Sequence, residues 1–117
     1  MSLLGRLVGI NEKELKEHPE LMPPKVVIFC ETNEGGYDRA SSRAMIDEII
    51  REFDDLTYLR RKQLRGEKVT LPEPREIYLP QRNSYRGYST EDIENFYHGY
   101  MAKFEELRRI IRDNDMS

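Results

Sequence analysis

The sequence predicts a mainly α protein with minor β structure (α+β), built on two long amphipathic helices. Apolar residues recur at spacings of three and four over residues 39–65 and again over 90–113. Between them, residues 66–89 carry three prolines, which forbid a continuous helix and predict an extended crossover. A short apolar run at 25–30 supplies the expected strand-like element.

The first 24 residues predict an N-terminal arm of short helical turns. Residues 3–8 (LLGRLV) have an amphipathic pattern, and Asn11 is placed to cap a turn over 11–18. Three prolines follow before residue 25 and prevent a longer helix. We therefore expect this arm to lead into the domain without forming a core of its own.

Residues 25–30 (KVVIFC) are β-branched and apolar without alternation, which predicts a buried strand or a buried extended segment. Cys30 is the only cysteine, so the chain has no internal disulfide. This favours the cytoplasm or another reducing compartment, or a virion assembled there. We expect Cys30 to be a small buried hydrophobe, not a nucleophile paired with His18 or His98.

A glycine turn follows the apolar run and precedes the first long helix. A strand, a glycine loop and a helix are the layout of phosphate-binding sites. A nucleotide-binding regulator or enzyme using residues 31–43 is therefore one alternative. Three acidic residues crowd the turn, however, and neither GxGxxG nor GxxxxGK[ST] is present. We favour a plain turn capped by Asp38, and we expect no cofactor.

The first long helix, 39–65, presents one broad apolar face and ends where Gly66 follows it. The second, 90–113, begins after Ser89 as cap, with Asp92 placed to reach back to it. Its heptad pattern predicts a helix interface made of Ile93, Tyr97, Tyr100, Phe104, Leu107 and Ile111.

The apolar stripe of the second helix is too wide for one helical partner. We expect a second partner, either residues 25–30 or another chain. The crossover is long enough for a parallel or an antiparallel pair. Residues 25–113 are thus predicted to be a single helical-hairpin domain, followed by a polar tail at 114–117.

The charge is unevenly distributed along the chain. Residues 60–86 hold eight basic and three acidic residues, which gives this segment a charge of +5. Since the net charge of the chain is −3, the remaining residues together carry −8. A small RNA- or DNA-binding accessory protein acting through 60–86 is the first alternative, although the net charge argues against it. The basic segment suits equally well the acidic flanks of another copy.

The crossover arm, residues 66–89, is rich in tyrosine and arginine, which are enriched in protein interfaces. We expect it to bury too little apolar surface to order itself, and so to be mobile when free and ordered in a complex. The predicted partner-binding residues are Arg75, Ile77, Tyr78, Leu79, Arg82, Tyr85, Arg86 and Tyr88.

Together these patterns favour a non-enzymatic structural or assembly subunit of a virion-like particle or multiprotein machine. Its expected partners are other protein subunits in a homo- or hetero-oligomer. No apolar run approaches the roughly 20 residues of a membrane span. Glu94 and His98 share a helix face, but no second such pair completes a metal site, and no catalytic site is predicted.

Overall fold

The computed structural model describes residues 12–83 and 85–115, and it confirms a mainly α fold with minor β structure. In chain order the elements are α2 (Glu12–Glu17), the 3₁₀ helix η1 (Pro19–Leu21), β1 (Glu31–Thr32), α3 (Arg39–Leu64), β2 (Gly87–Tyr88) and α4 (Thr90–Asp113). Both long helices have the predicted bounds to within one residue. The predicted turn at 3–8 and the last two residues of the polar tail lie outside the described residues.

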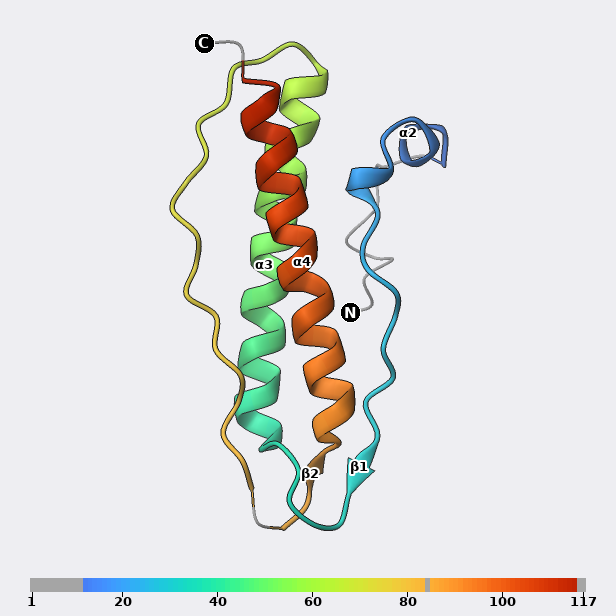
Figure 1. The fold of residues 1–117 in the computed structure, drawn as a ribbon, viewed down its shortest axis with the longest axis vertical. Coiled ribbons are helices and arrows are strands. Elements are labelled where there is room, and N and C mark those ends of the chain that lie inside the picture. The colour runs from blue at the N-terminus through green and yellow to red at the C-terminus, as the bar shows by residue number, and fades with distance from the viewer. Residues whose placement is uncertain (1–11, 84, 116–117) are drawn as a thin grey trace.

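The two long helices lie side by side and run in the same direction (Figure 1). Near their beginnings the Tyr37 hydroxyl donates to the Glu94 carboxylate at 3.2 Å, and near their ends the Gln63 amide donates to the Ile111 carbonyl at 2.8 Å. The sequence allows a parallel or an antiparallel pair of helices, and the structure has the parallel one. Twenty or so extended residues exceed the roughly 40 Å length of α3, so the crossover can return to its start.

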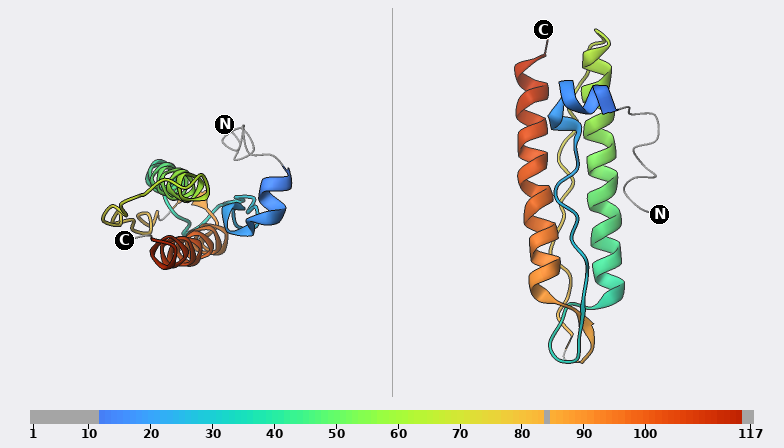
Figure 2. Two further views of the ribbon diagram at one scale, coloured as in Figure 1. Left: turned by 90° about the horizontal axis from the view of Figure 1, so that it is seen from above. Right: turned by 90° about the vertical axis from the view of Figure 1, so that its right-hand side faces the viewer.

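Two extended segments flank the helix pair on opposite sides and run against the helix direction (Figure 2). One is residues 22–30, here called the strip, and the other is the crossover arm. At the lower end of the molecule in Figure 1, β1 and β2 join them in a two-stranded antiparallel sheet that pairs Glu31 with Tyr88. The helix pair thus has an extended chain along each of its two grooves.

The core lies between the two helices and beneath the extended segments. Its buried apolar residues are Tyr37, Met45, Ile49, Phe53, Leu56, Ile77, Ile93, Phe96, Tyr100, Phe104, Leu107 and Ile111. Five of the six predicted interface residues of α4 are among them, and Tyr97 is half-buried. The rings of Phe53 and Tyr100 meet edge to face at 5.6 Å and join α3 to α4.

The strip is extended, as predicted, but it is neither paired as a strand nor fully buried. Val27 and Phe29 pack against the core, whereas Val26 and Ile28 are 72% and 80% exposed. The expectation that Cys30 is buried is wrong, because its side chain is exposed. The groove between two helices accepts one face of an extended chain, and the other face is left in solvent.

Two tyrosines of α4 differ in whether their hydroxyl groups are hydrogen-bonded. The buried Tyr100 hydroxyl has no hydrogen-bond partner among the described residues, and the Tyr97 hydroxyl donates to the Ile77 carbonyl at 2.9 Å. Tyr97→Phe should lower the free energy of unfolding by about 1 kcal/mol, while Tyr100→Phe should leave it unchanged or raise it by a similar amount. Thermal unfolding of both variants checks this, and equal losses would contradict it.

Tyr100 also affects the stability of the fold at alkaline pH. Burial, with a smaller contribution from the charge of Asp54, raises the pKa of Tyr100 from 10.0 to about 12. Since the folded pKa is above the unfolded one, stability is lost as the pH rises from 10 toward 12. Tyr100→Phe should remove that part of the alkaline loss, as measured by denaturation at neutral and alkaline pH.

Candidate interaction surface

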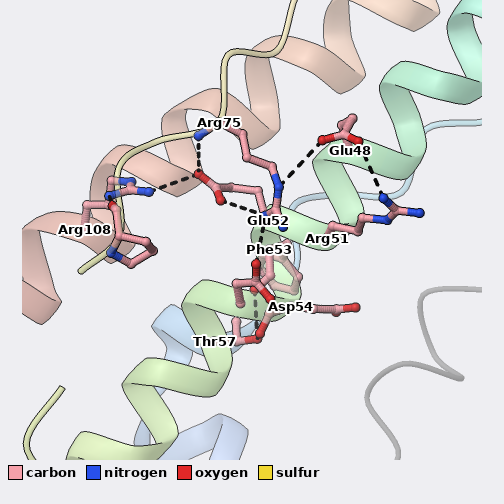
Figure 3. Close-up of polar contacts among 10 residues, drawn as sticks. Glu48, Arg51, Glu52, Phe53, Asp54, Thr57, Arg75 and Arg108 are labelled. Atoms are coloured by element: carbon pink, nitrogen blue, oxygen red, sulfur yellow. Dashed lines mark hydrogen bonds and ion pairs between the residues drawn. The ribbon is translucent and has the colours of Figure 1, made fainter. Parts of the chain in front are cut away.

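A buried carboxylate fastens the crossover arm to both helices (Figure 3). Glu52 of α3 accepts from the Arg75 guanidinium at 3.0 Å and from the Arg108 guanidinium at 3.1 Å. Arg75 also lies 2.9 Å from Asp55 and 3.6 Å from Glu48. A single glutamate of α3 therefore connects the arm to α4, and its burial makes both arginines necessary as partners.

Further contacts hold the inner side of the crossover arm against its own helices. The Arg108 guanidinium donates to the Pro72 carbonyl at 2.8 Å, while Val69, Leu71 and Ile77 pack on the core. The arm is expected to bury too little apolar surface to order itself, and the structure adds these contacts with its own helices, which the sequence does not reveal. A parallel helix pair offers a groove along its whole length, and the arm fills it with alternate side chains and charge pairs.

The outer side of the crossover arm contains the accessible part of the predicted partner-binding set. Tyr78 and Tyr85 are 71% and 77% exposed, Leu79 is also exposed, and so is Arg86. Of the remaining four, Arg75 and Ile77 contact the chain's own helices, the Arg82 guanidinium lies over the Tyr37 ring at 5.3 Å, and Tyr88 is part of β2. Arg82 is exposed despite this ring contact, so five of the eight predicted residues are exposed.

The strip is held at both ends, and its middle is open. At one end Leu21 is fully buried, and Glu20 accepts from Arg60 at 2.7 Å in a buried pair. Burial opposes ionisation of Glu20, but the hydrogen bond from Arg60 prevails and holds its pKa below the usual value. At the other end the Cys30 amide donates to the Asp92 carboxylate at 2.9 Å. The Asp92 side chain therefore bonds the strip, while its backbone amide donates to the Ser89 hydroxyl, which caps α4, at 3.4 Å.

A groove of about 370 Å³ lies between the strip and α4. It is lined by Pro24, Lys25, Val26, Val27 and Ile28 from the strip and by Asp92, Asn95, Phe96, Gly99 and Tyr100 from α4. Gly99 lines this groove without a side chain that would fill it. A methyl group there would meet only the Pro24 side chain, at an ordinary contact distance of 3.7 Å. Nothing among the described residues requires glycine at this position of the helix.

Gly99→Ala should raise the free energy of unfolding by about 1 kcal/mol, since alanine is the better helix former and the site has room for its methyl group. Gly36→Ala is the matched control. A methyl group on Gly36 would lie 2.6 Å from the Tyr88 carbonyl oxygen, so this variant should lose stability. Urea denaturation measures both, and a loss in Gly99→Ala would show that the helix needs this glycine.

Most of the basic residues in 60–86 have partners in the same chain. Arg60 pairs with Glu20, Arg61 with Glu14 at 3.2 Å, and Arg65 with Glu67 at 3.1 Å, in addition to the pairs of Arg75. Arg60, Arg61 and Arg75 pair with acidic residues outside 60–86, so these charges, which the sequence offers to another copy, are already paired within one molecule. Exposed cations that remain in this segment include Lys68 and Arg86.

The glycine turn is closed by backbone hydrogen bonds. The amides of Tyr37 and Asp38 donate to the carbonyls of Tyr88 and Gln81, and the Asp38 carboxylate caps α3 through the Ser41 amide at 2.8 Å. An incoming phosphate would find these two amides already bonded and an acidic side chain at the helix start. No group of three or more histidine, cysteine, aspartate or glutamate side chains that could hold a metal occurs in 12–83 and 85–115.

The chain matches no protein-family model, and no curated protein or solved structure is detectably similar to it. Of the helices in the described part of the chain, none combines the length and the apolar character that crossing a membrane demands. The case for a function therefore rests on the surfaces of the strip and the crossover arm.

Sequence reasoning missed the outer face of the strip as a binding surface. The available signal was the lack of alternation in KVVIFC, which makes both faces of an extended chain apolar. That pattern predicts a segment that is buried on both faces. The structure covers one face only, so the other face is the more informative one.

Proposed function

We propose that this protein is a non-enzymatic assembly subunit that binds neighbouring copies of itself through the outer faces of the strip and the crossover arm. One observation carries the proposal. Two extended segments lie on opposite sides of a helix pair and expose large apolar side chains, namely Val26 and Ile28 on the strip and Tyr78 and Tyr85 on the arm.

Exposed apolar side chains that occur singly are ordinary, but neighbouring ones on a fixed backbone mark interaction sites. The strip is held by the buried Glu20–Arg60 pair and the arm by the pairing of Arg75 with the buried Glu52, so their outer faces are ordered before a partner arrives. Surfaces on opposite sides allow each subunit to contact two neighbours. That arrangement suits a virion-like shell or a multiprotein machine in a reducing compartment, where the exposed Cys30 thiol would persist.

The RNA- or DNA-binding alternative predicts a different response to salt. The ion pairs of Arg60, Arg61 and Arg65 weigh against it, because these charges are already partly neutralised. The nucleotide-binding alternative is weakened by the bonded amides of Tyr37 and Asp38. In the described part of the chain, neither alternative is supported by a cluster of unpaired hydrogen-bond donors.

Sedimentation velocity of the purified chain, from low to high micromolar concentration and at low and high salt, tests the proposal. We expect species larger than the monomer that persist at high salt, because apolar contacts are not screened. A compact monomer at every concentration would contradict the proposal. Association that needs added nucleic acid and disappears at high salt would favour the first alternative.

A further inference from the structure

We propose that the strip is a homodimer interface, in which a second copy packs its own strip antiparallel across a two-fold axis through Ile28. This inference rests on the proposed function and identifies the surface and the partner. A two-fold interface brings the same patch of both molecules together, so the patch must be complementary to itself.

The strip surface has both parts that such self-complementarity requires. Val26 and Ile28 project from it, and the groove beside Gly99 lies directly alongside, with Phe96 and Tyr100 in its lining. The two Ile28 side chains therefore meet at the axis, and the Val26 side chain of each copy can enter the groove of the other. This gives Gly99 a role that the single chain does not, because a side chain there would narrow the groove that receives the partner.

The charges at the two ends of the strip are also complementary. Lys25 and Glu91 are exposed, and neither forms an ion pair within the described part of the chain. An antiparallel pairing about residue 28 places Lys25 opposite residue 31 of the second copy. Residue 31 is Glu31, an exposed acid that already pairs with Arg39, and it adjoins the start of α4, since the Ser89 amide donates to the Cys30 carbonyl at 2.8 Å. Lys25 of each copy would then face Glu91 of the other, twice in one dimer.

The backbone of the strip is prepared for such a contact. In 12–83 and 85–115, residues 25–29 make no backbone hydrogen bond to any other segment. Their conformation is nevertheless fixed, because the strip is held by the Glu20–Arg60 pair at one end and by Cys30 at the other. A second copy would therefore meet an ordered surface and would lose little conformational freedom on binding.

Charge reversal tests the pairing of Lys25 with Glu91. Lys25→Glu and Glu91→Lys should each raise the dissociation constant of the dimer about five- to tenfold, because each contact occurs twice. The double variant should recover most of the wild-type affinity, since the reversed charges attract again. Arg109→Glu, on an exposed side of α4 outside both the strip and the crossover arm, is the matched control and should leave this dimer unchanged. Sedimentation velocity measures all four, and thermal unfolding verifies that each is folded.

Two substitutions at Ile28 test the position of the axis. Ile28→Glu should abolish the dimer without unfolding the chain, because this side chain is 80% exposed. On addition of oxidised glutathione, Ile28→Cys with Cys30→Ser should form a disulfide-linked dimer, whereas the exposed control Tyr58→Cys with Cys30→Ser should not. An oligomer that is insensitive to the strip variants would overturn this interface and leave the proposed function standing. A wild-type chain that never associates would overturn both.

Discussion

Phe104→Ala is expected to lower the free energy of unfolding by about 3–5 kcal/mol, a large share of the stability of a domain this size. Phe104 is buried in the α3–α4 core, and its ring lies 5.9 Å from that of Tyr100. Removing it leaves a cavity that two long helices cannot easily close. Urea denaturation followed by circular dichroism measures the loss.

Tyr58→Ala is the control for Phe104→Ala. Tyr58 lies on the same helix pair but is largely exposed, so its truncation should change the stability by no more than about 0.5 kcal/mol. If both variants unfold at the wild-type midpoint, the face of α4 that contains Phe104 is not buried. The packing of the helix pair would then be wrong.

Glu52→Gln is expected to cost about 3 kcal/mol, because it removes the charge that both Arg75 and Arg108 need in a largely buried site. The amide keeps the size of the side chain, so the effect reports charge and not volume. The loss should also loosen the crossover arm, which depends on Arg75 for its connection to α3. Denaturation gives the stability, and the rate of proteolysis within residues 66–83 gives the loosening.

Glu48→Gln separates this buried contact from an ordinary surface ion pair. Glu48 lies 3.6 Å from the same arginine but is well exposed, so its neutralisation should cost no more than about 0.5 kcal/mol. Equal and small effects of both variants would mean that Glu52 does not fasten the arm. The arm would then be held by its other contacts, among them the apolar packing of Ile77 and the hydrogen bond from Arg108 to the Pro72 carbonyl.

The sequence predicted the two long helices well because the signals for them are local. Apolar spacing defines each helix, Asp38 and Ser89 cap their beginnings, and Gly66 follows the end of the first. Each of these signals involves residues within a few positions of one another. The same reasoning predicted the buried face of α4, because its heptad pattern identifies one side of the helix.

Local sequence patterns could not predict the direction of the helix pair or the packing of the crossover arm. A long crossover permits either direction, and contacts such as Glu52 with Arg75 and Arg108 join residues far apart in the sequence. The charged residues of the arm led to the expectation that it buries too little apolar surface to pack on its own domain. The acidic partners of Arg75 lie on α3, so this arginine stabilises the monomer before it contacts anything else.

The candidate site was predicted in part. Tyr78, Leu79, Tyr85 and Arg86 of the crossover arm are exposed as a binding surface requires. The outer face of the strip was not foreseen, because an apolar run without alternation is typical of a strand buried on both sides. That interpretation identified the two apolar faces correctly and assumed that one chain covers both.

Hydroxyl-radical footprinting read by mass spectrometry is the most direct test that the outer faces of the strip and the crossover arm are binding surfaces. The purified chain at low concentration is compared with the assembly isolated from its native source. We predict that Met22, Tyr78 and Tyr85 react readily in the dilute chain and become protected in the assembly, while the buried Tyr100 reacts slowly in both. Equal reactivity of the three exposed residues in both samples would contradict the account.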